Sequence, residues 1–443
     1  MKWISIYLFF LLFLLISSQV EVLAQDAEEE PSIWNRETAT GDWGGLRTPF
    51  NNNGFTLELS FIGDVMSNVS GGINRKSVFI QNIDLKFVID NEKLIGLPGS
   101  NILFSALQNN GNSISQYAGD VQGVSNIEAV QTIRLFEVWL QQKLLSNRLS
   151  ILGGLYDINS EFDVMGSAAL FMQSSQGLGG DFAGSGLIGP PTFPAAGLGG
   201  RIKFVPDRRI YIQAGLMDGA PASLNSAKST DFTWNNADGT LAVAELGLLS
   251  FGQQEFIAQD NLSTRQSRSF IGREVSSDYR TKIALGVWSY SKNYVSDRYG
   301  TTLPTVTDDQ NDKGLYILAD WKWNPNPQKT YQQLSVFGRI GFSENEVSRF
   351  KSYGGWGVTY KGLIPGDPNG LLGFSLASVQ GSKLFQQLNG QVDDFETVLE
   401  FTYLTKVIPW LNIQPDIQYV ISPGAISNTS NALVIGLRTD ITL

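Results

Sequence analysis

Cysteine and histidine are both absent from the 443-residue chain. Without cysteine no disulfide can stabilise the fold, so its stability has to come from packing and backbone hydrogen bonds. Without histidine there is no Ser-His-Asp triad, no Cys-His pair and no histidine metal ligand. These absences argue against most hydrolases and metalloenzymes, and we expect no catalytic residues, no cofactor and no metal site.

Positive charge is also scarce, since 32 Lys and Arg face 42 Asp and Glu, which gives a net charge of -10. Binding to nucleic acid requires a basic face that neutralises phosphates, so an acidic chain is not expected to bind DNA or RNA. The chain also has 46 glycines and 11% aromatic residues. This composition suits a protein with many turns and many two-faced strands.

One long hydrophobic run lies at the N-terminus. Residues 4–16 are mainly apolar, follow Lys2 and precede the small residues Val22 and Ala24. A run of roughly 13 residues is shorter than the ~20 that a membrane-spanning helix needs. Residues 1–24 are therefore predicted to be a secretory signal peptide. We expect residues 25–54 to form a periplasmic or plug segment.

From residue 55 to residue 443, short segments alternate between hydrophobic and polar residues. In the last one, Leu433, Ile435 and Leu437 alternate with residues such as Arg438 and Asp440. Side chains point alternately to the two faces of a strand, so each segment has one apolar and one polar face. About sixteen such segments occur, and each is predicted to be a strand.

The connections between these segments are of two kinds. Residues 206–208, 324–327 and 365–370 are short turns, whereas 109–131, 159–194, 218–238, 293–313 and 380–394 are long loops. Short turns on one rim and long loops on the other are typical of outer-membrane barrels.

A soluble sandwich would show the same alternation of apolar and polar residues. Here, however, the polar faces carry fixed charges of both signs, and aromatic residues such as Trp321 and Trp323 cluster at strand ends, as in a membrane-interface belt. The sequence therefore predicts an all-β, transmembrane, antiparallel up-and-down β-barrel over residues 55–443. We expect it in the outer membrane of a Gram-negative-type bacterium, in contact with outer-membrane lipid.

Three motifs stand outside the strand pattern. They are Gly-Asp-Trp-Gly-Gly-Leu-Arg at 41–47, the stretch from Asp181-Phe182 to Gly-Pro-Pro-Thr-Phe-Pro at 189–194, and Gln-Pro-Asp-Ile-Gln-Tyr at 414–419 with Ser-Pro-Gly at 422–424. In this order they resemble the OprB family of carbohydrate-selective porins, over nearly all of the chain after residue 24. The resemblance implies a sixteen-stranded barrel, narrowed by an inward-folded N-terminal segment and loop, that passes monosaccharides and similar small polar solutes. A homotrimer is compatible with it.

Charged side chains on the inner face are the candidates for sugar binding, because they form charge-assisted hydrogen bonds with hydroxyl groups. The predicted pore-lining residues are Arg47, Asp84, Lys86, Glu137, Arg201, Lys282, Arg339, Glu400, Asp416 and Arg438. Those expected at the constriction are Arg47, Glu137, Arg201, Arg339 and Asp416. The loop that contains Asp181, Phe182 and Phe193 is rich in Gly and Pro and is the expected constriction loop.

Two alternatives stay open within the channel class, because inward Arg and Lys residues also suit an anion or phosphate channel, or a general diffusion porin. The mixed signs of the inward charges favour neutral solutes. A structural or adhesive outer-membrane barrel is the alternative of another class. A barrel enzyme with a serine triad is ruled out because the chain has no histidine.

Overall fold

The protein is described here by a computed structural model that covers residues 32–221, 230–234, 239–251, 279–295, 310–326, 328–390 and 395–443. The predicted signal peptide, residues 1–24, lies outside these described residues, as does the first part of the predicted segment 25–54. Within the described ranges, no helix combines the length and the apolar character needed to cross a membrane.

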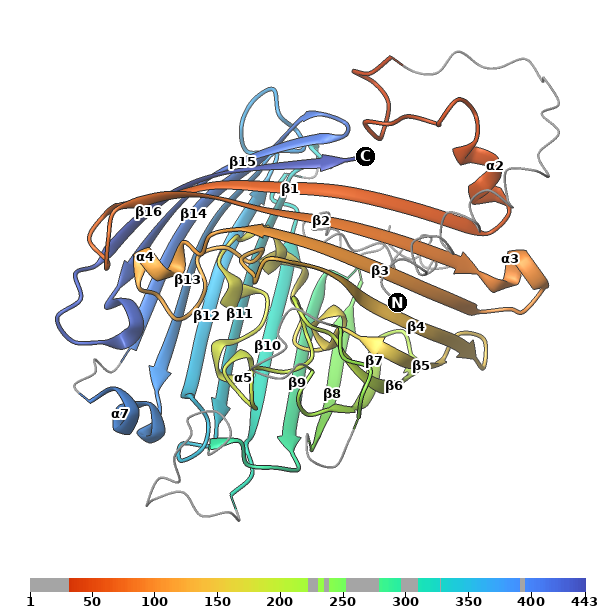
Figure 1. The fold of residues 1–443 in the computed structure, drawn as a ribbon. Coiled ribbons are helices and arrows are strands. Elements are labelled where there is room, and N and C mark those ends of the chain that lie inside the picture. The colour runs from red at the N-terminus through yellow and green to blue at the C-terminus, as the bar shows by residue number, and fades with distance from the viewer. Residues whose placement is uncertain are drawn as a thin grey trace.

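Sixteen antiparallel strands form one closed barrel, in which each strand pairs with its neighbours in sequence and β1 pairs with β16 (Figure 1). The predicted all-β, antiparallel, up-and-down barrel of about sixteen strands is confirmed. The strands are β1 (Phe55–Ser70), β2 (Lys76–Asp90), β3 (Ser100–Gly111), β4 (Thr132–Leu144), β5 (Leu149–Tyr156), β6 (Gly197–Asp207), β7 (Ile210–Asp218), β8 (Thr240–Ser250), β9 (Thr281–Tyr290), β10 (Lys313–Trp323), β11 (Gln333–Ser343), β12 (Phe350–Lys361), β13 (Leu371–Gly381), β14 (Phe395–Ile408), β15 (Leu411–Ile421) and β16 (Ala432–Thr442).

The described helices are short and lie in the connections between strands. They are the α-helices α2 (Arg47–Asn52), α3 (Asn91–Ile95), α4 (Ser115–Ala118), α5 (Gly180–Ala183) and α7 (Lys383–Asn389), and the 3-10 helices η1 (Ile158–Ser160), η2 (Gly166–Leu170), η3 (Ser174–Gln176) and η6 (Pro423–Ala425). Helices of this length gain little stability from their own hydrogen bonds. They depend on contacts with the barrel wall.

The apolar face of each strand points outward. Along β10, Leu315, Ile317 and Trp321 are exposed, whereas Tyr316 and Asp320 between them are buried inside the barrel. In β7, β9 and β16 exposed apolar residues likewise alternate with buried ones. The buried set includes polar residues such as Lys282 and Arg438 and also apolar ones such as Trp288 and Val434, which belong to apolar clusters inside the barrel. An apolar outer surface on a closed sheet is the arrangement that a barrel needs in lipid.

The two rims of the barrel differ, as the loop lengths predict. The short-turn rim carries the start of β1, the end of β16 and tight connections such as 145–148, 208–209 and 409–410. The long-loop rim carries the connections 112–131 and 157–196. In outer-membrane barrels the short turns face the periplasm. The strands β8 and β9 are an exception to the alternation, because β8 ends at Ser250 and β9 begins only at Thr281, both at the short-turn rim.

In its described part, residues 32–54, the N-terminal segment packs on the outside of the barrel, so the expectation that it narrows the pore is wrong for these residues. The ring of Phe50 in α2 stacks on Phe55 at a centroid distance of 5.3 Å and lies 6.2 Å from Phe87. Phe55 and Phe87 belong to the outward-facing apolar residues of β1 and β2. The helix packs on the outside of the barrel because its aromatic side chain has apolar partners there.

Arg47 is consequently not at the constriction, contrary to the prediction. Its guanidinium lies 4.3 Å above the Trp43 ring and donates to the backbone oxygen of Leu443 at 3.0 Å. The amide of Ala39 also donates to the oxygen of Thr442 at 2.8 Å. The motif at 41–47 thus holds the N-terminal segment against the end of β16.

The pair Asp64 and Arg438 joins β1 to β16 where the barrel closes. The two residues are cross-strand partners. Arg438 donates from Nε and from Nη2 to the two carboxylate oxygens of Asp64, each at 2.7 Å, and both side chains are buried. A two-point arginine–carboxylate contact fixes geometry as well as charge. It therefore helps to set the register of the closing strand pair.

Replacing Arg438 with Met is expected to destabilise the barrel by about 3–5 kcal/mol, because the Asp64 carboxylate would stay buried without its counter-charge. Urea titration in lipid vesicles, followed by tryptophan fluorescence, measures this change. The double variant Asp64→Leu/Arg438→Met removes both charges and should recover most of the lost stability. An equal loss in the single and double variants would contradict this account of the pair.

Candidate functional site

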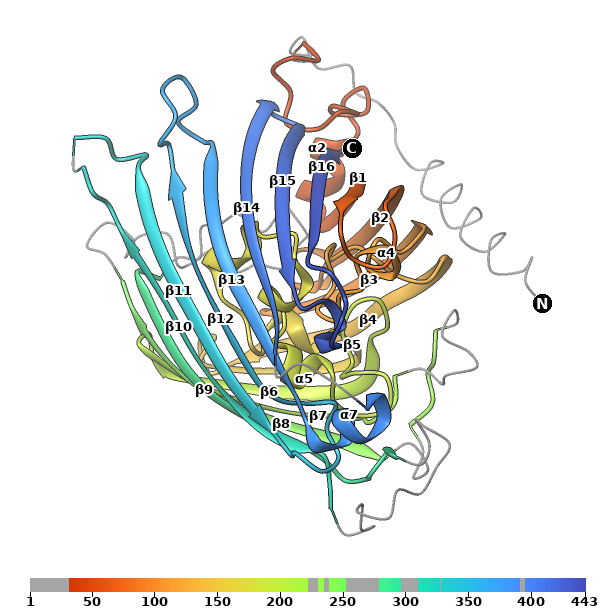
Figure 2. The same ribbon diagram turned by 90° about the vertical axis from the view of Figure 1, so that its left-hand side faces the viewer.

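The connection between β5 and β6, residues 157–196, folds into the barrel instead of extending from its rim (Figure 2). We call it the constriction loop; it contains η1, η2, η3 and α5. Most of its residues have no strand partner, yet they are largely buried. Buried backbone N–H and C=O groups need hydrogen-bond partners. Side chains of the barrel wall provide many of them.

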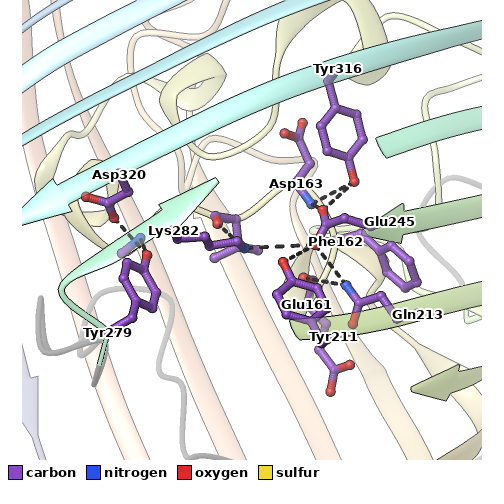
Figure 3. Close-up of polar contacts among 12 residues, drawn as sticks. Glu161, Phe162, Asp163, Tyr211, Gln213, Glu245, Tyr279, Lys282, Tyr316 and Asp320 are labelled. Atoms are coloured by element: carbon purple, nitrogen blue, oxygen red, sulfur yellow. Dashed lines mark hydrogen bonds and ion pairs between the residues drawn. The ribbon is translucent and has the colours of Figure 1, made fainter. Parts of the chain in front are cut away.

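Wall carboxylates accept hydrogen bonds from backbone amides of the constriction loop. Glu245 of β8 accepts from the amide of Asp163 at 2.9 Å, and Asp320 of β10 accepts from Ser167 at 3.0 Å. Figure 3 shows these two carboxylates on either side of Lys282. Further along the loop, Glu400 accepts from the amide of Met172 at 2.6 Å. Each acceptor satisfies a backbone amide that would otherwise be buried without a partner, so these contacts hold the loop in place.

Wall cations bind the loop in the complementary way, through its carbonyl and carboxylate oxygens. Arg339 of β11 forms an ion pair with Asp163 at 2.7 Å between Nε and Oδ1. Its two Nη atoms donate to the backbone oxygens of Asp163, Ser175 and Gly177 at 2.5, 3.2 and 3.3 Å. Arg339 is 2% exposed. Its buried guanidinium therefore holds the loop against β11 through these four contacts.

Two further wall cations hold the first part of the loop. Arg201 of β6 pairs with Glu161 at 2.7 Å, and Lys282 of β9 donates to the oxygen of Val164 at 2.7 Å. Both side chains are buried at the wall. The loop is therefore held from β6, β9 and β11, on several sides of the lumen.

A second inward segment, residues 112–131 between β3 and β4, was not singled out by the sequence. Asn126 accepts from Arg438 at 2.8 Å, and the amide of Val121 donates to Glu396 of β14 at 2.9 Å. This segment also bonds to the constriction loop, because the amide of Asn126 donates to the oxygen of Met172 at 2.7 Å. The two segments together narrow the lumen.

Of the ten predicted pore-lining residues, the structure brings six into contact with the inward segments, namely Glu137, Arg201, Lys282, Arg339, Glu400 and Arg438. Glu137 accepts from the amide of Asp157, where the constriction loop begins, at 3.1 Å. Asp84 and Lys86 pair with each other at 3.3 Å, and Asp416 accepts from Gln418 at 2.9 Å. Direct contact of these residues with solute stays a prediction.

The three loop residues chosen from the sequence lie between the loop and the wall. Phe182 is fully buried and stacks on Trp288 at 4.9 Å, while Phe193 meets Phe136 edge-on at 6.3 Å. Asp181 is also buried. Burial raises the pKa of Asp181 to about 7, and the neighbouring Asp163 carboxylate adds to the increase. In a chain without histidine, Asp181 is thus a group that can titrate near neutral pH.

The sequence did not reveal the loop residues that pair with the wall cations. Glu161 and Asp163 flank Phe162 in a loop that is otherwise rich in small and apolar residues. Two acids in such a loop, inside a barrel with inward arginines, are the signal that could have identified them. Glu245 was missed because the strand around it has a weak pattern.

Some polar residues of the two inward segments are less buried than the wall charges. Ser160, Glu161 and Ser174 of the constriction loop and Asn126 of the second segment are half-buried, in contrast to the buried wall charges. Hydroxyl, amide and carbonyl groups can replace the water around an uncharged polar solute without binding it tightly. The arrangement suits a narrow passage for neutral, hydroxyl-rich molecules.

Comparisons with known proteins agree with this geometry. Residues 77–443 match the family described as carbohydrate-selective porin, OprB family. The chain is 24% identical over 439 residues to Porin B of Pseudomonas aeruginosa, with 91% of each chain covered. The high-pH structure of Pseudomonas putida OprB has the same fold, with a TM-score of 0.76, 18% identity and 93% and 100% of the two chains covered. Its low-pH structure matches with a TM-score of 0.56, 17% identity and 92% and 99% coverage.

These matches extend over nearly all of the described barrel, and the family model alone covers most of the chain. Both the sequence motifs and the closed sixteen-stranded barrel with inward-folded segments are accounted for by the same relationship. The chain therefore belongs to the OprB family of carbohydrate-selective porins, which are channels of the Gram-negative outer membrane.

Proposed function

We propose that this protein lets monosaccharides and similar small polar solutes diffuse passively and selectively across the outer membrane. The constriction loop carries this proposal. Its backbone amides and the Asp163 carboxylate bind the wall charges Glu245, Asp320 and Arg339. We therefore expect a solute to contact polar groups of the loop more than these wall charges. The protein is a channel, and no step of its action requires bond chemistry.

Liposome swelling tests the proposal directly. Liposomes that contain the purified protein are expected to swell faster in glucose than in a trisaccharide, because the inward segments narrow the lumen. Protein-free liposomes are the control. Equal rates for both sugars would favour a general diffusion porin, and no swelling in glucose would favour a structural or adhesive barrel.

Replacing Arg339 or Arg201 with Ala is expected to widen the pore and reduce its selectivity. Arg339→Ala removes the contacts to three loop carbonyls and the ion pair with Asp163, whereas Arg201→Ala removes the ion pair with Glu161. Single-channel conductance should rise by roughly twofold as the loop leaves the wall, and the glucose-to-trisaccharide swelling ratio should fall. Lys361→Ala, on the inner face of β12, is the matched control. Unchanged conductance and sugar flux in both arginine variants would remove these residues from the site.

We further propose that copies of the barrel associate as a homotrimer in the membrane, surrounded by outer-membrane lipid. An apolar groove of about 760 Å³ crosses the outer faces of β5 to β9. It is lined by small residues such as Gly200, Ala214 and Ala242, with Trp234 at its edge. Small side chains let two surfaces approach closely within a bilayer.

Light scattering of the detergent-solubilised protein measures the number of copies per particle. The wild type is expected to be a trimer, and Ala242→Trp, which fills the groove, should shift it to a monomer. The control is Leu315→Trp, on the outer face of β10. A monomeric wild type, or a trimer that Ala242→Trp leaves intact, would contradict this placement of the contact.

A further inference from the structure

Three cations gather on the inner wall between the constriction loop and the short-turn rim. Arg201 and Lys203 lie on the same face of β6, two positions apart, and Lys282 lies on β9. The amines of Lys203 and Lys282 are 5.0 and 5.6 Å from the centre of the Tyr211 ring on β7. We call these three residues the exit-side cation cluster.

Two carboxylates, Glu161 and Glu245, lie near this cluster, and Glu245 also accepts hydrogen bonds from tyrosine hydroxyls. Glu161 pairs with Arg201 at 2.7 Å. Glu245 accepts from the hydroxyls of Tyr211 and Tyr316, each at 2.6 Å, and lies 3.9 Å from Lys282 (Figure 3). The cluster thus has three positive charges against two negative charges.

Lys203 is the cation of the cluster that forms no ion pair within the described residues, and it is half-buried. Its amine lies 5.0 Å from the centre of the Tyr211 ring. The charges near it are those of Glu161 and Glu245, which also contact other donors, and those of Arg201 and Lys282. Cations gathered at a channel wall can attract an anionic group. Such an arrangement is a candidate functional site when it lies in a channel.

The cluster lies on the short-turn side of the constriction loop, so it can contact a solute that has passed the loop. Arg201 and Lys282 hold the constriction loop through Glu161 and Val164, so they lie directly beneath it. Lys203 lies beyond Arg201, toward the end of β6 at the short-turn rim. A solute that has passed the loop from the long-loop side therefore reaches Lys203 next.

We propose that the exit-side cation cluster binds the acidic group of an anionic sugar, either a carboxylate or a phosphate ester, with Lys203 as its main contact. This inference rests on the proposed function, because the sugar framework has to pass the constriction loop first. The lysine amine is a flexible point charge with three donors, so it can follow an acidic group without fixing its orientation. Binding by one amine is weak enough to allow release.

Channel block in planar bilayers tests the proposal, with glucose, potassium glucuronate and glucose 6-phosphate as the probes. For the wild type, the two anionic sugars should half-block the current at lower concentrations than glucose does. Lys203→Gln should raise the half-blocking concentration of at least one of them roughly three- to tenfold, as expected for the loss of one nearby charge. The value for glucose should change by less than about twofold.

Two further variants separate charge from shape. Lys203→Arg keeps the charge and should retain block by the anionic sugars, whereas Lys406→Gln removes an exposed lysine of β14 and should leave every value unchanged. If Lys203→Gln leaves the anionic-to-neutral ratio at the wild-type value, the proposed subsite is wrong. Failure of glucose to enter liposomes would instead refute the proposed function, so the two results are distinguishable.

Discussion

Every backbone amide and carbonyl that leaves water has to find a hydrogen-bond partner, and both surfaces of this protein follow from that requirement. Toward the lipid, the closed ring from β1 to β16 leaves no unpaired strand edge. Toward the lumen, the constriction loop has no strand to pair with. Its amides and carbonyls are bound by wall side chains such as Glu245, Glu400 and Arg339. One constraint therefore explains the closed sheet and the charged interior.

The charged interior in turn gives the loop its position. A carboxylate can accept hydrogen bonds from several amides, and a guanidinium can donate hydrogen bonds to several carbonyls. Arg339 alone donates to three loop carbonyls. Breaking such a buried contact costs more than its net stabilisation, because the remaining partner is left unsatisfied. The wall charges thus determine pore width indirectly, through the position of the loop.

The strands were predictable because a period of two is a local signal. The alternation that ends the chain corresponds to β16, and a shift by one residue would turn its apolar side chains into the lumen. The loop contacts were not predictable in the same way. Arg339 and the Asp163 carbonyl are 176 positions apart, and parity shows which face a side chain takes but not what covers it. Arg47 was misplaced because its motif has no periodicity that could indicate which surface it packs on.

A channel has to combine selectivity with fast release. In this barrel the pairing of charges differs between the constriction and the wall near Lys203. At the constriction the charges are paired with one another or with the loop, so a neutral solute meets dipoles instead of an unbalanced field. Strong binding there would slow permeation. Between the loop and the short-turn rim, positive charge exceeds negative charge at the cluster that contains Lys203. Because loop packing and this local charge arise from different residues, Lys203 can alter the preference for acidic sugars while Arg339 keeps the constriction in place.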